Sequence, residues 1–453
     1  MRQLTKEENK AFYAKVFSLT IPLALQNLIN VAVTAADTVM LGKVSEVVLS
    51  GASLAGQIQY ILTLFFFGIT SGAAVLTAQY WGKRDIRTIE KIVAIALDVA
   101  IALSFIFSLA AFLLPEKLMS IYSSDPLVIE AGASYLKIIS LSYIISGITM
   151  IYLYIMKSVE RVVISTVVYC VSLGVNIVLN AILIFGLFGA PALGIRGAAI
   201  GTLTARCVEL LIVVFYAKFK NREIKVRIKD MLHPDKVLMR EFFYYAIPVT
   251  LNEFFWGLAT SANTAIIAQL STPAAAANSV AQVARQLATV AGYGVSSAAA
   301  IILGKTIGEN REDLAEIYAH KLIRISLIFG FLGGLCIFLM RGPIIHFMGF
   351  TAETSAYLTL MLFVMFYYTT AQTYNTTVIV GVLRSGGDTR FGLILDFVSM
   401  WGCSVPLGFI AAFVLKLDPK IVYLILTADE ICKMPFTRHR WRKMGWLRNI
   451  THD

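Results

Sequence analysis

Long runs of apolar residues alternate with short polar segments along the chain, and the length of these runs predicts the structural elements. A helix needs about 20 apolar residues to cross the hydrocarbon core of a bilayer. Twelve runs reach that length, near residues 16–42, 48–79, 91–114, 131–155, 162–188, 194–217, 242–268, 274–304, 318–340, 352–382, 391–415 and 419–436. The pattern predicts an all-α polytopic membrane protein with twelve transmembrane helices.

The first apolar run, Ile21–Gly42, is repeated in the second half of the chain. A shift of 226 residues aligns 21–90 with 247–316 without a gap, and 16 of the 70 aligned positions are identical. Each half holds six spans, so both halves enter the membrane in the same direction, as parallel repeats. The expected parts are an N-terminal six-helix lobe at 1–217, a basic cytoplasmic linker at 218–240, a C-terminal six-helix lobe at 241–437 and a basic cytoplasmic tail at 438–453.

Composition and charge support a membrane protein and argue against a nucleic-acid-binding one. Hydrophobic residues make up 58% of the chain and charged residues 15%, and the net charge is +11. Of the 39 Lys and Arg, 30 fall at the termini and in the loops on one side of the predicted spans. The positive-inside rule places that side, with both termini, in the cytoplasm. We therefore expect a multi-pass protein of the inner membrane, with a solvated linker and a tail that anchors at the membrane surface.

One carboxylate in the first span, Asp37, is the strongest functional candidate. An ionisable side chain within a membrane span is costly, by roughly 2.5 to 3.5 kcal/mol at mid-helix. Asn176 and Asn180 lie one turn apart in the fifth span, at about the depth of Asp37. Burial among amides disfavours the ionised carboxylate, so the group could exchange a proton, and the same hard oxygens could hold Na⁺. The alternative is a hydrogen-bonded brace without titration.

The repeat does not duplicate this acid. Asp37 aligns with Asn263, whereas Glu253 in the seventh span aligns with Asn27. Glu253 and Arg285 are predicted at a similar level, so Glu253 either pairs with Arg285 or faces the cavity as a cation site. Other polar and aromatic side chains are candidates for a substrate cavity. They are Gln57, Trp256, Asn278, Gln282, Arg285, Tyr293, Tyr367 and Asn375.

The sequence holds no constellation typical of an enzyme. The five histidines are scattered, without HExxH spacing, and there is no GxSxG elbow. The five cysteines lie inside apolar runs without CxxC spacing and are predicted to be small core residues. We expect neither an enzyme nor a cofactor, and no metal centre beyond a Na⁺ that could bind at Asp37, Asn176 and Asn180.

Several motifs together resemble the multidrug and toxic compound extrusion (MATE) transporters. They are IP followed by ADTVMLG in the first span, NxxxN with LIFG in the fifth, LGIRGAAIGT into the sixth, and LRSGGDTR before the eleventh. The resemblance covers about residues 12–440. It implies an antiporter that expels organic cations and drugs in exchange for H⁺ or Na⁺ by alternating access of two six-helix lobes, and we expect it to act as a monomer.

Carried over by residue, the resemblance places the first-lobe acid at Asp37, the polar pair at Asn176 and Asn180, and the second-lobe glutamate at Glu253. NorM-like members carry an acid in the tenth span, where this chain has Asn375 instead. Archaeal-like members carry Asp at the position of Asn180. These departures favour H⁺ over Na⁺. A flippase for lipid-linked sugars in the same superfamily is the alternative, and a channel or receptor is a further one.

Overall fold

The computed structural model describes residues 4–452, which form helices and no strands. The α-helices are α1 (Lys6–Gly42), α2 (Glu46–Lys83), α3 (Ile86–Leu113), α4 (Pro115–Ser120), α5 (Pro126–Ile139), α6 (Ser142–Ser158), α7 (Val162–Phe185), α8 (Ile195–Phe215), α9 (Ile228–Leu232), α10 (Lys236–Leu270), α11 (Thr272–Gly308), α12 (Glu312–Met348), α13 (Ala352–Thr376), α14 (Thr389–Phe397), α15 (Val405–Phe409), α16 (Pro419–Leu426) and α17 (Asp429–Arg442). Wider helical turns extend several of them, η3 (Thr377–Leu383) after α13 and η5 (Val398–Ser404) and η6 (Ile410–Val414) around α15.

The twelve predicted runs all coincide with helical segments, which confirms the predicted fold class. Eight helices in the described part of the chain are long and apolar enough to cross a membrane. The pair α5 and α6, bent by 53°, adds a ninth span. The other three predicted spans are α10, α13 with η3, and α16 with α17. Tyr, Thr and Asn lower the hydropathy of α10 and α13, and α16 and α17 are each short.

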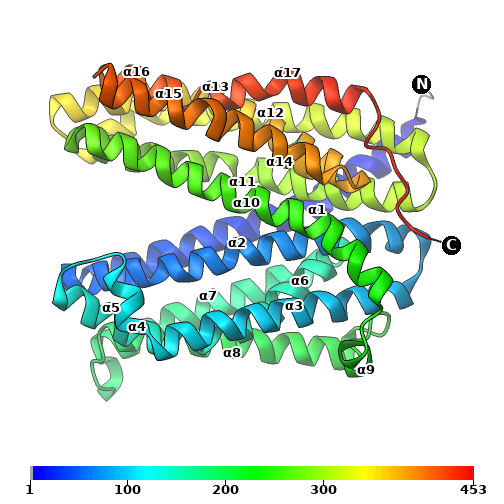
Figure 1. The fold of residues 1–453 in the computed structure, drawn as a ribbon, viewed down its shortest axis with the longest axis horizontal. Coiled ribbons are helices and arrows are strands. Elements are labelled where there is room, and N and C mark those ends of the chain that lie inside the picture. Colours follow the sequence, from blue (N-terminus) through cyan, green and yellow to red (C-terminus); the bar gives the residue numbers. More distant parts are fainter. Residues whose placement is uncertain (1–3, 453) are drawn as a thin grey trace. The chain divides into compact units, whose positions relative to one another are not determined.

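The chain divides into two compact units. Unit 1 comprises Met1–Ala24, Ala78–Lys83 and Leu251–Asp453, and unit 2 comprises Leu25–Thr77 and Arg84–Thr250. Within unit 1, α11, α12 and α13 pack against one another (Figure 1). Within unit 2, α7 packs on α8 and α3 packs on α6 (Figure 1). The lobe and linker boundaries expected from the repeat stay a prediction.

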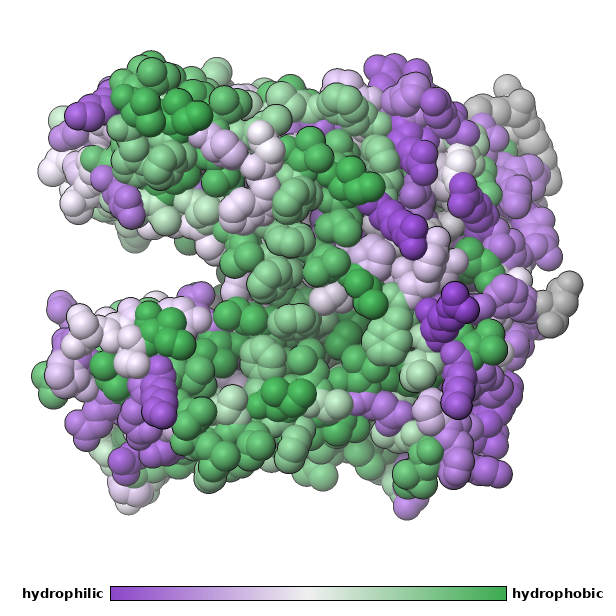
Figure 2. All heavy atoms as spheres, in the orientation of Figure 1, coloured by the Kyte–Doolittle hydropathy of each residue, from purple (hydrophilic) through white to green (hydrophobic). Residues whose placement is uncertain are grey.

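The outer faces of the helices are apolar, as a bilayer requires. Figure 2 shows hydrophobic side chains covering the middle of each unit, with hydrophilic ones gathered towards the helix ends. The cysteines follow this pattern and correct the prediction that they lie in the core: Cys170, Cys336, Cys403 and Cys432 are exposed. An apolar run in a membrane span does not indicate burial in protein, since lipid is as apolar as the core.

The segment between the halves is folded onto α3, which corrects the expectation of a solvated linker. Asp230 on α9 accepts hydrogen bonds from Arg87 at 2.5 Å, and Lys91 lies 3.0 Å from Asp235. Glu90 accepts bonds from the Lys225 backbone at 2.9 Å and from the Arg227 side chain at 2.8 Å. The linker is therefore held on α3 by ion pairs of both senses: its acids bind basic residues of α3, and its Arg227 binds Glu90 of α3.

These ion pairs predict how docking of the linker depends on pH. Hydrogen bonds from Arg87 and Lys91 lower the pKa of Asp230 and of Asp235 below the ordinary value of 3.8. A depressed pKa stabilises the folded arrangement above the ordinary value, and that contribution is lost as the pH falls through the lowered one. Hydrogen exchange across residues 222–232, corrected for its intrinsic pH dependence, should therefore keep its protection from pH 8 to 5 and lose it below about pH 4. Loss of protection between pH 7 and 5 would contradict this assignment.

The C-terminal tail also packs against protein, which corrects the interpretation of it as a surface anchor. Trp441 and Trp446 are buried, and the indole of Trp446 donates to the Trp441 carbonyl at 2.9 Å. A Cβ at Gly386 would lie 1.5 Å from the Trp446 carbonyl oxygen, so only glycine permits this approach. Arg440 donates to Asp388 at 2.7 Å. The tail is therefore a folded part of unit 1.

Candidate functional site

The predicted polar layer of the first half is assembled in unit 2. Asp37 lies late in α1, where its side chain is half-buried, and the amide of Asn180 on α7 donates to its Oδ1 at 2.5 Å. The same amide reaches Asn176 Oδ1 at 3.3 Å, and Asn176 donates to the Thr202 hydroxyl on α8 at 3.2 Å. The sequence prediction that these groups lie together is confirmed in its geometry.

Two features hold this layer in place. Asn180 is fully buried, and a Cβ at Gly201 would lie 2.2 Å from its Oδ1, so the glycine lets α8 approach α7 at this level. Leu41 lies one turn beyond Asp37 and packs with Ile184 of α7 and Ala198 of α8 in an apolar cluster. The carboxylate is thereby held at the edge of a packed core.

The positive charge that acts on Asp37 belongs to Arg206, and Arg206 is paired with another acid. Arg206 acts electrostatically on Asp37, but it donates to both oxygens of Glu209, at 2.7 and 2.9 Å. Glu209 is buried, with 1% of its surface exposed. Arg206 and Glu209 lie three residues apart on α8, so this ion pair is local. Because Glu209 compensates Arg206, the group that hydrogen-bonds Asp37 in the described part of the chain is the neutral amide of Asn180.

Glu253 in unit 1 has a different partner from the one considered from the sequence. Its Oε1 lies 3.0 Å from Arg384, which also donates to Asn252 Oδ1 at 2.7 Å. Arg285 instead faces the ring of Tyr368, 5.8 Å from its centroid. The interpretation of Glu253 as a partner of Arg285 is therefore corrected. Arg384 was missed because its Gly-rich segment was assigned to a cytoplasmic loop, whereas the side chain is 4% exposed.

The Glu253–Arg384 pair predicts the result of a charge exchange. Glu253→Arg and Arg384→Glu should each lower the drug efflux that the resemblance implies to a small fraction of wild type, because each leaves like charges together in a buried site. The double exchange should recover at least several-fold over either single variant in ethidium efflux from everted vesicles. A double variant no better than the worse single one would indicate that Glu253 acts apart from Arg384.

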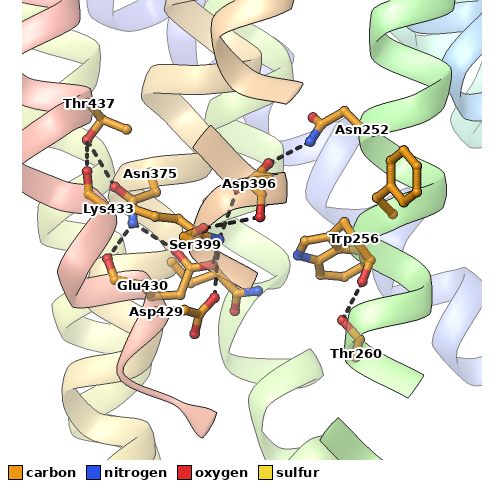
Figure 3. Close-up of polar contacts among 12 residues, drawn as sticks. Asn252, Trp256, Thr260, Asn375, Asp396, Ser399, Asp429, Glu430, Lys433 and Thr437 are labelled. Atoms are coloured by element: carbon orange, nitrogen blue, oxygen red, sulfur yellow. Dashed lines mark hydrogen bonds and ion pairs between the residues drawn. The ribbon is translucent and has the colours of Figure 1, made fainter. Parts of the chain in front are cut away.

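Unit 1 holds a second ionic cluster, whose members the sequence does not link to one another. Lys433 Nζ lies 3.0 Å from Asp396 on α14, and 3.2 Å from each of Asp429 and Glu430 on its own helix (Figure 3). Asp429 and Glu430 lie about one turn before Lys433 on α17, so their pairing with it is local. The addition of Asp396 is new and ties α14 to α17. We call these four residues the Lys433 cluster.

Amides complete the Lys433 cluster. Asn252 donates to Asp396 at 2.7 Å, and Asn375 donates to the Glu430 side chain at 2.8 Å (Figure 3). Asn375, predicted as a cavity residue, is 2% exposed and also accepts from Thr437 at 3.1 Å. Its hydrogen-bonding groups are therefore engaged within the protein. The sequence does contain an indication of this cluster, because three acids and one lysine are costly to bury in spans eleven and twelve unless they pair.

The remaining predicted cavity residues are spread over both units. Asn278, Gln282 and Arg285 line one pocket of unit 1 with residues of α10, α13 and α16. Trp256, Tyr293 and Tyr367 are half-buried in unit 1, and Gln57 is exposed in unit 2. Their part in binding substrate stays a prediction. Among the described residues no group of three or more His, Cys, Asp or Glu could hold a metal ion.

Comparison with known proteins gives the chain its family. The MatE family matches residues 22–182 and 248–410, one segment in each half. The chain is 26% identical over 459 residues to a probable multidrug resistance protein NorM of Thermotoga maritima, covering 98% of this chain and 96% of that protein. It is 23% identical over 445 residues to an uncharacterized transporter, YisQ, of Bacillus subtilis, covering 98% and 97%.

Solved structures share the fold. A MATE structure in the bent conformation superposes with a TM-score of 0.86 at 16% identity, covering 96% of this chain and 96% of that one. An outward-facing MATE family transporter of the MOP superfamily gives a TM-score of 0.83 at 17% identity, covering 95% and 96%. The family match extends over both repeats and most of the chain. The chain belongs to the MatE family, the multidrug and toxic compound extrusion transporters of the membrane.

Proposed function

We propose that this transporter is a secondary antiporter that expels organic cations and drugs in exchange for protons taken up at Asp37. The observation that carries the proposal is the isolation of Asp37, a single carboxylate among amide and hydroxyl groups, with Asn180 donating to it at 2.5 Å. Such a carboxylate is neutral when it binds one proton, and it carries one negative charge after the proton is released. Proton binding therefore changes the charge of the site by a full unit in a low-dielectric environment.

The same geometry favours H⁺ over Na⁺ as the coupling ion. The nitrogen of Asn180 faces Asp37, and an amide nitrogen donates hydrogen bonds but does not ligate a hard cation. A Na⁺ site would need the Asn180 oxygen turned towards the carboxylate, and would still hold only one charged ligand. Protonation needs neither change.

A multidrug substrate range is supported by relatives, several of which are described as multidrug resistance proteins. A flippase for anionic lipid-linked sugars would need several free arginines along its cavity. Of the buried arginines described above, Arg206 is bound to Glu209 at 2.7 Å and Arg384 to Glu253 at 3.0 Å. The charge distribution therefore favours drug efflux. We place the transporter in the inner membrane as a monomer with both termini in the cytoplasm.

The choice of driving ion is tested by imposing one gradient at a time on everted vesicles. We expect ethidium to accumulate when the lumen is acidified in Na⁺-free buffer, and a Na⁺ gradient without a pH gradient to drive no accumulation. Vesicles from cells that lack the protein provide the background. Accumulation driven only by Na⁺ would contradict H⁺ coupling, and no accumulation under either gradient would contradict drug antiport.

A further inference from the structure

Asn263, which aligns with Asp37 in the second repeat, lines a pocket inside unit 1. The pocket lies among α10, α11, α13 and α16 and has a volume of about 40 Å³. This volume suits a carboxylate group or one halide ion, but not a whole drug molecule. Its polar lining includes Asn263, Asn278, Gln282, Arg285, Tyr368 and Tyr423. No carboxylate is among the lining residues.

The charged group of this pocket is Arg285, which aligns with Gln59 in the first repeat. Arg285 is 9% exposed, and its Nε has no hydrogen-bond partner among the described residues. Within residues 4–452 no carboxylate lies within 4 Å of its guanidinium. Glu430, which acts on it electrostatically, is already held by Lys433 at 3.2 Å and Asn375 at 2.8 Å. The positive charge of Arg285 therefore faces the pocket without a bound counter-charge.

The amides around Arg285 are also unsatisfied. Asn263 Oδ1 and Gln282 Oε1 are buried without hydrogen-bond partners in the described structure. An amide can turn to present either its NH₂ or its oxygen, so these side chains can donate to an anion beside the guanidinium. Burying a cation without a counter-charge is costly, and an anionic ligand beside Arg285 removes that cost.

We propose that this pocket binds a small anionic group through Arg285, either the carboxylate of a transported molecule or a free halide ion. The two repeats then carry complementary chemistry at aligned positions, an acid at Asp37 and a guanidinium beside Asn263. The substrate form of the proposal rests on the drug-antiport function proposed above. In this form, the carboxylate of a zwitterionic substrate binds Arg285 in the pocket of unit 1.

Anion binding is tested directly on the purified protein by thermal unfolding in potassium salts of equal ionic strength. A ligand that binds only the folded state raises the melting temperature. Sulfate stabilises folded proteins generally, so the melting temperature in chloride or acetate is expressed relative to that in sulfate. We expect this relative value to be higher in the wild type than in Arg285→Gln, with Arg285→Lys between the two. Arg324→Gln, which removes an exposed arginine of α12 in the same unit, should keep the wild-type value.

Transport separates the two sources of the anion. Rhodamine 110 carries a free carboxyl group, and rhodamine 123 is its methyl ester, so the ratio of their efflux rates reports the carboxylate alone. We expect Arg285→Gln to lower the efflux rate of rhodamine 110 relative to that of rhodamine 123 about tenfold. A hydrogen bond to a charged group contributes a factor of about ten or more to binding. A changed ratio without a salt effect on melting identifies the substrate carboxylate, and a salt effect with an unchanged ratio identifies a free halide.

The proposal is overturned if Arg285→Gln alters neither the salt dependence of melting nor the dye ratio. If the wild type transports neither dye, the drug-antiport function fails on its own, and the melting series still decides whether Arg285 binds an anion.

Discussion

Replacing Asp37 with asparagine is expected to reduce proton-driven ethidium efflux in everted vesicles to the background of vesicles without the protein. The amide keeps the size of the side chain and an oxygen that can accept from Asn180, but it cannot take up and release a proton. The variant should therefore fold, insert and melt within a few degrees of the wild type. The charge change that couples the two fluxes would be lost.

Asp125→Asn is the matched control for this variant. Asp125 is exposed and caps α5, accepting from the Leu127 backbone at 2.9 Å, and asparagine caps helices about as well as aspartate. We expect full efflux in this control. Undiminished efflux in Asp37→Asn, with normal protein levels, would exclude Asp37 as the coupling residue.

Replacing Lys433 with methionine is expected to have the largest effect on stability. Lys433 is 1% exposed and is the one ammonium between three carboxylates, so its removal leaves buried acids that repel one another. Removing one partner of a buried ion pair costs about 3 to 5 kcal/mol. We expect a fall of several degrees in the melting temperature of the purified protein, together with reduced expression.

Two further variants make this result specific. Lys10→Met removes an exposed lysine of α1 and should change the melting temperature little. Adding Asp396→Asn to Lys433→Met should recover part of the loss, because one of the uncompensated charges is removed. A Lys433→Met variant as stable as the wild type would show that the Lys433 cluster does not brace α14 against α17.

The depth of a residue in a membrane span can be read from sequence, because a helix rises 1.5 Å per residue from a known side. This is why the positions of Asp37, Asn176 and Asn180 predicted a shared polar layer. The face of each helix is harder to predict when lipid and core are both apolar. Cys170 and Cys336 were assigned to the core for this reason and lie on the exposed surface.

The missed partners share a different cause. Arg384 is 131 residues from Glu253, in a turn that composition assigns to a loop, and its burial depends on how the 384–386 turn and Trp446 pack. Asp396 and Lys433 lie in separate spans with no motif that links them. Such long-range ion pairs depend on the rotation of each helix, which the repeat alignment leaves undetermined.

The repeat also explains why the two units differ in their chemistry. In the alignment of the two halves, Asp37 is replaced by Asn263 and Gln59 by Arg285. Under the two proposals above, unit 2 binds the proton and unit 1 binds the anionic group.

The central claim, that protons bound at Asp37 are exchanged for drug, is tested most directly by the pH inside proteoliposomes. Ethidium added outside should enter in exchange for protons and make the lumen more alkaline. The change should be the same with and without Na⁺, and absent with Asp37→Asn. Entry of ethidium without any change in lumenal pH, or accompanied by efflux of Na⁺ alone, would contradict the account.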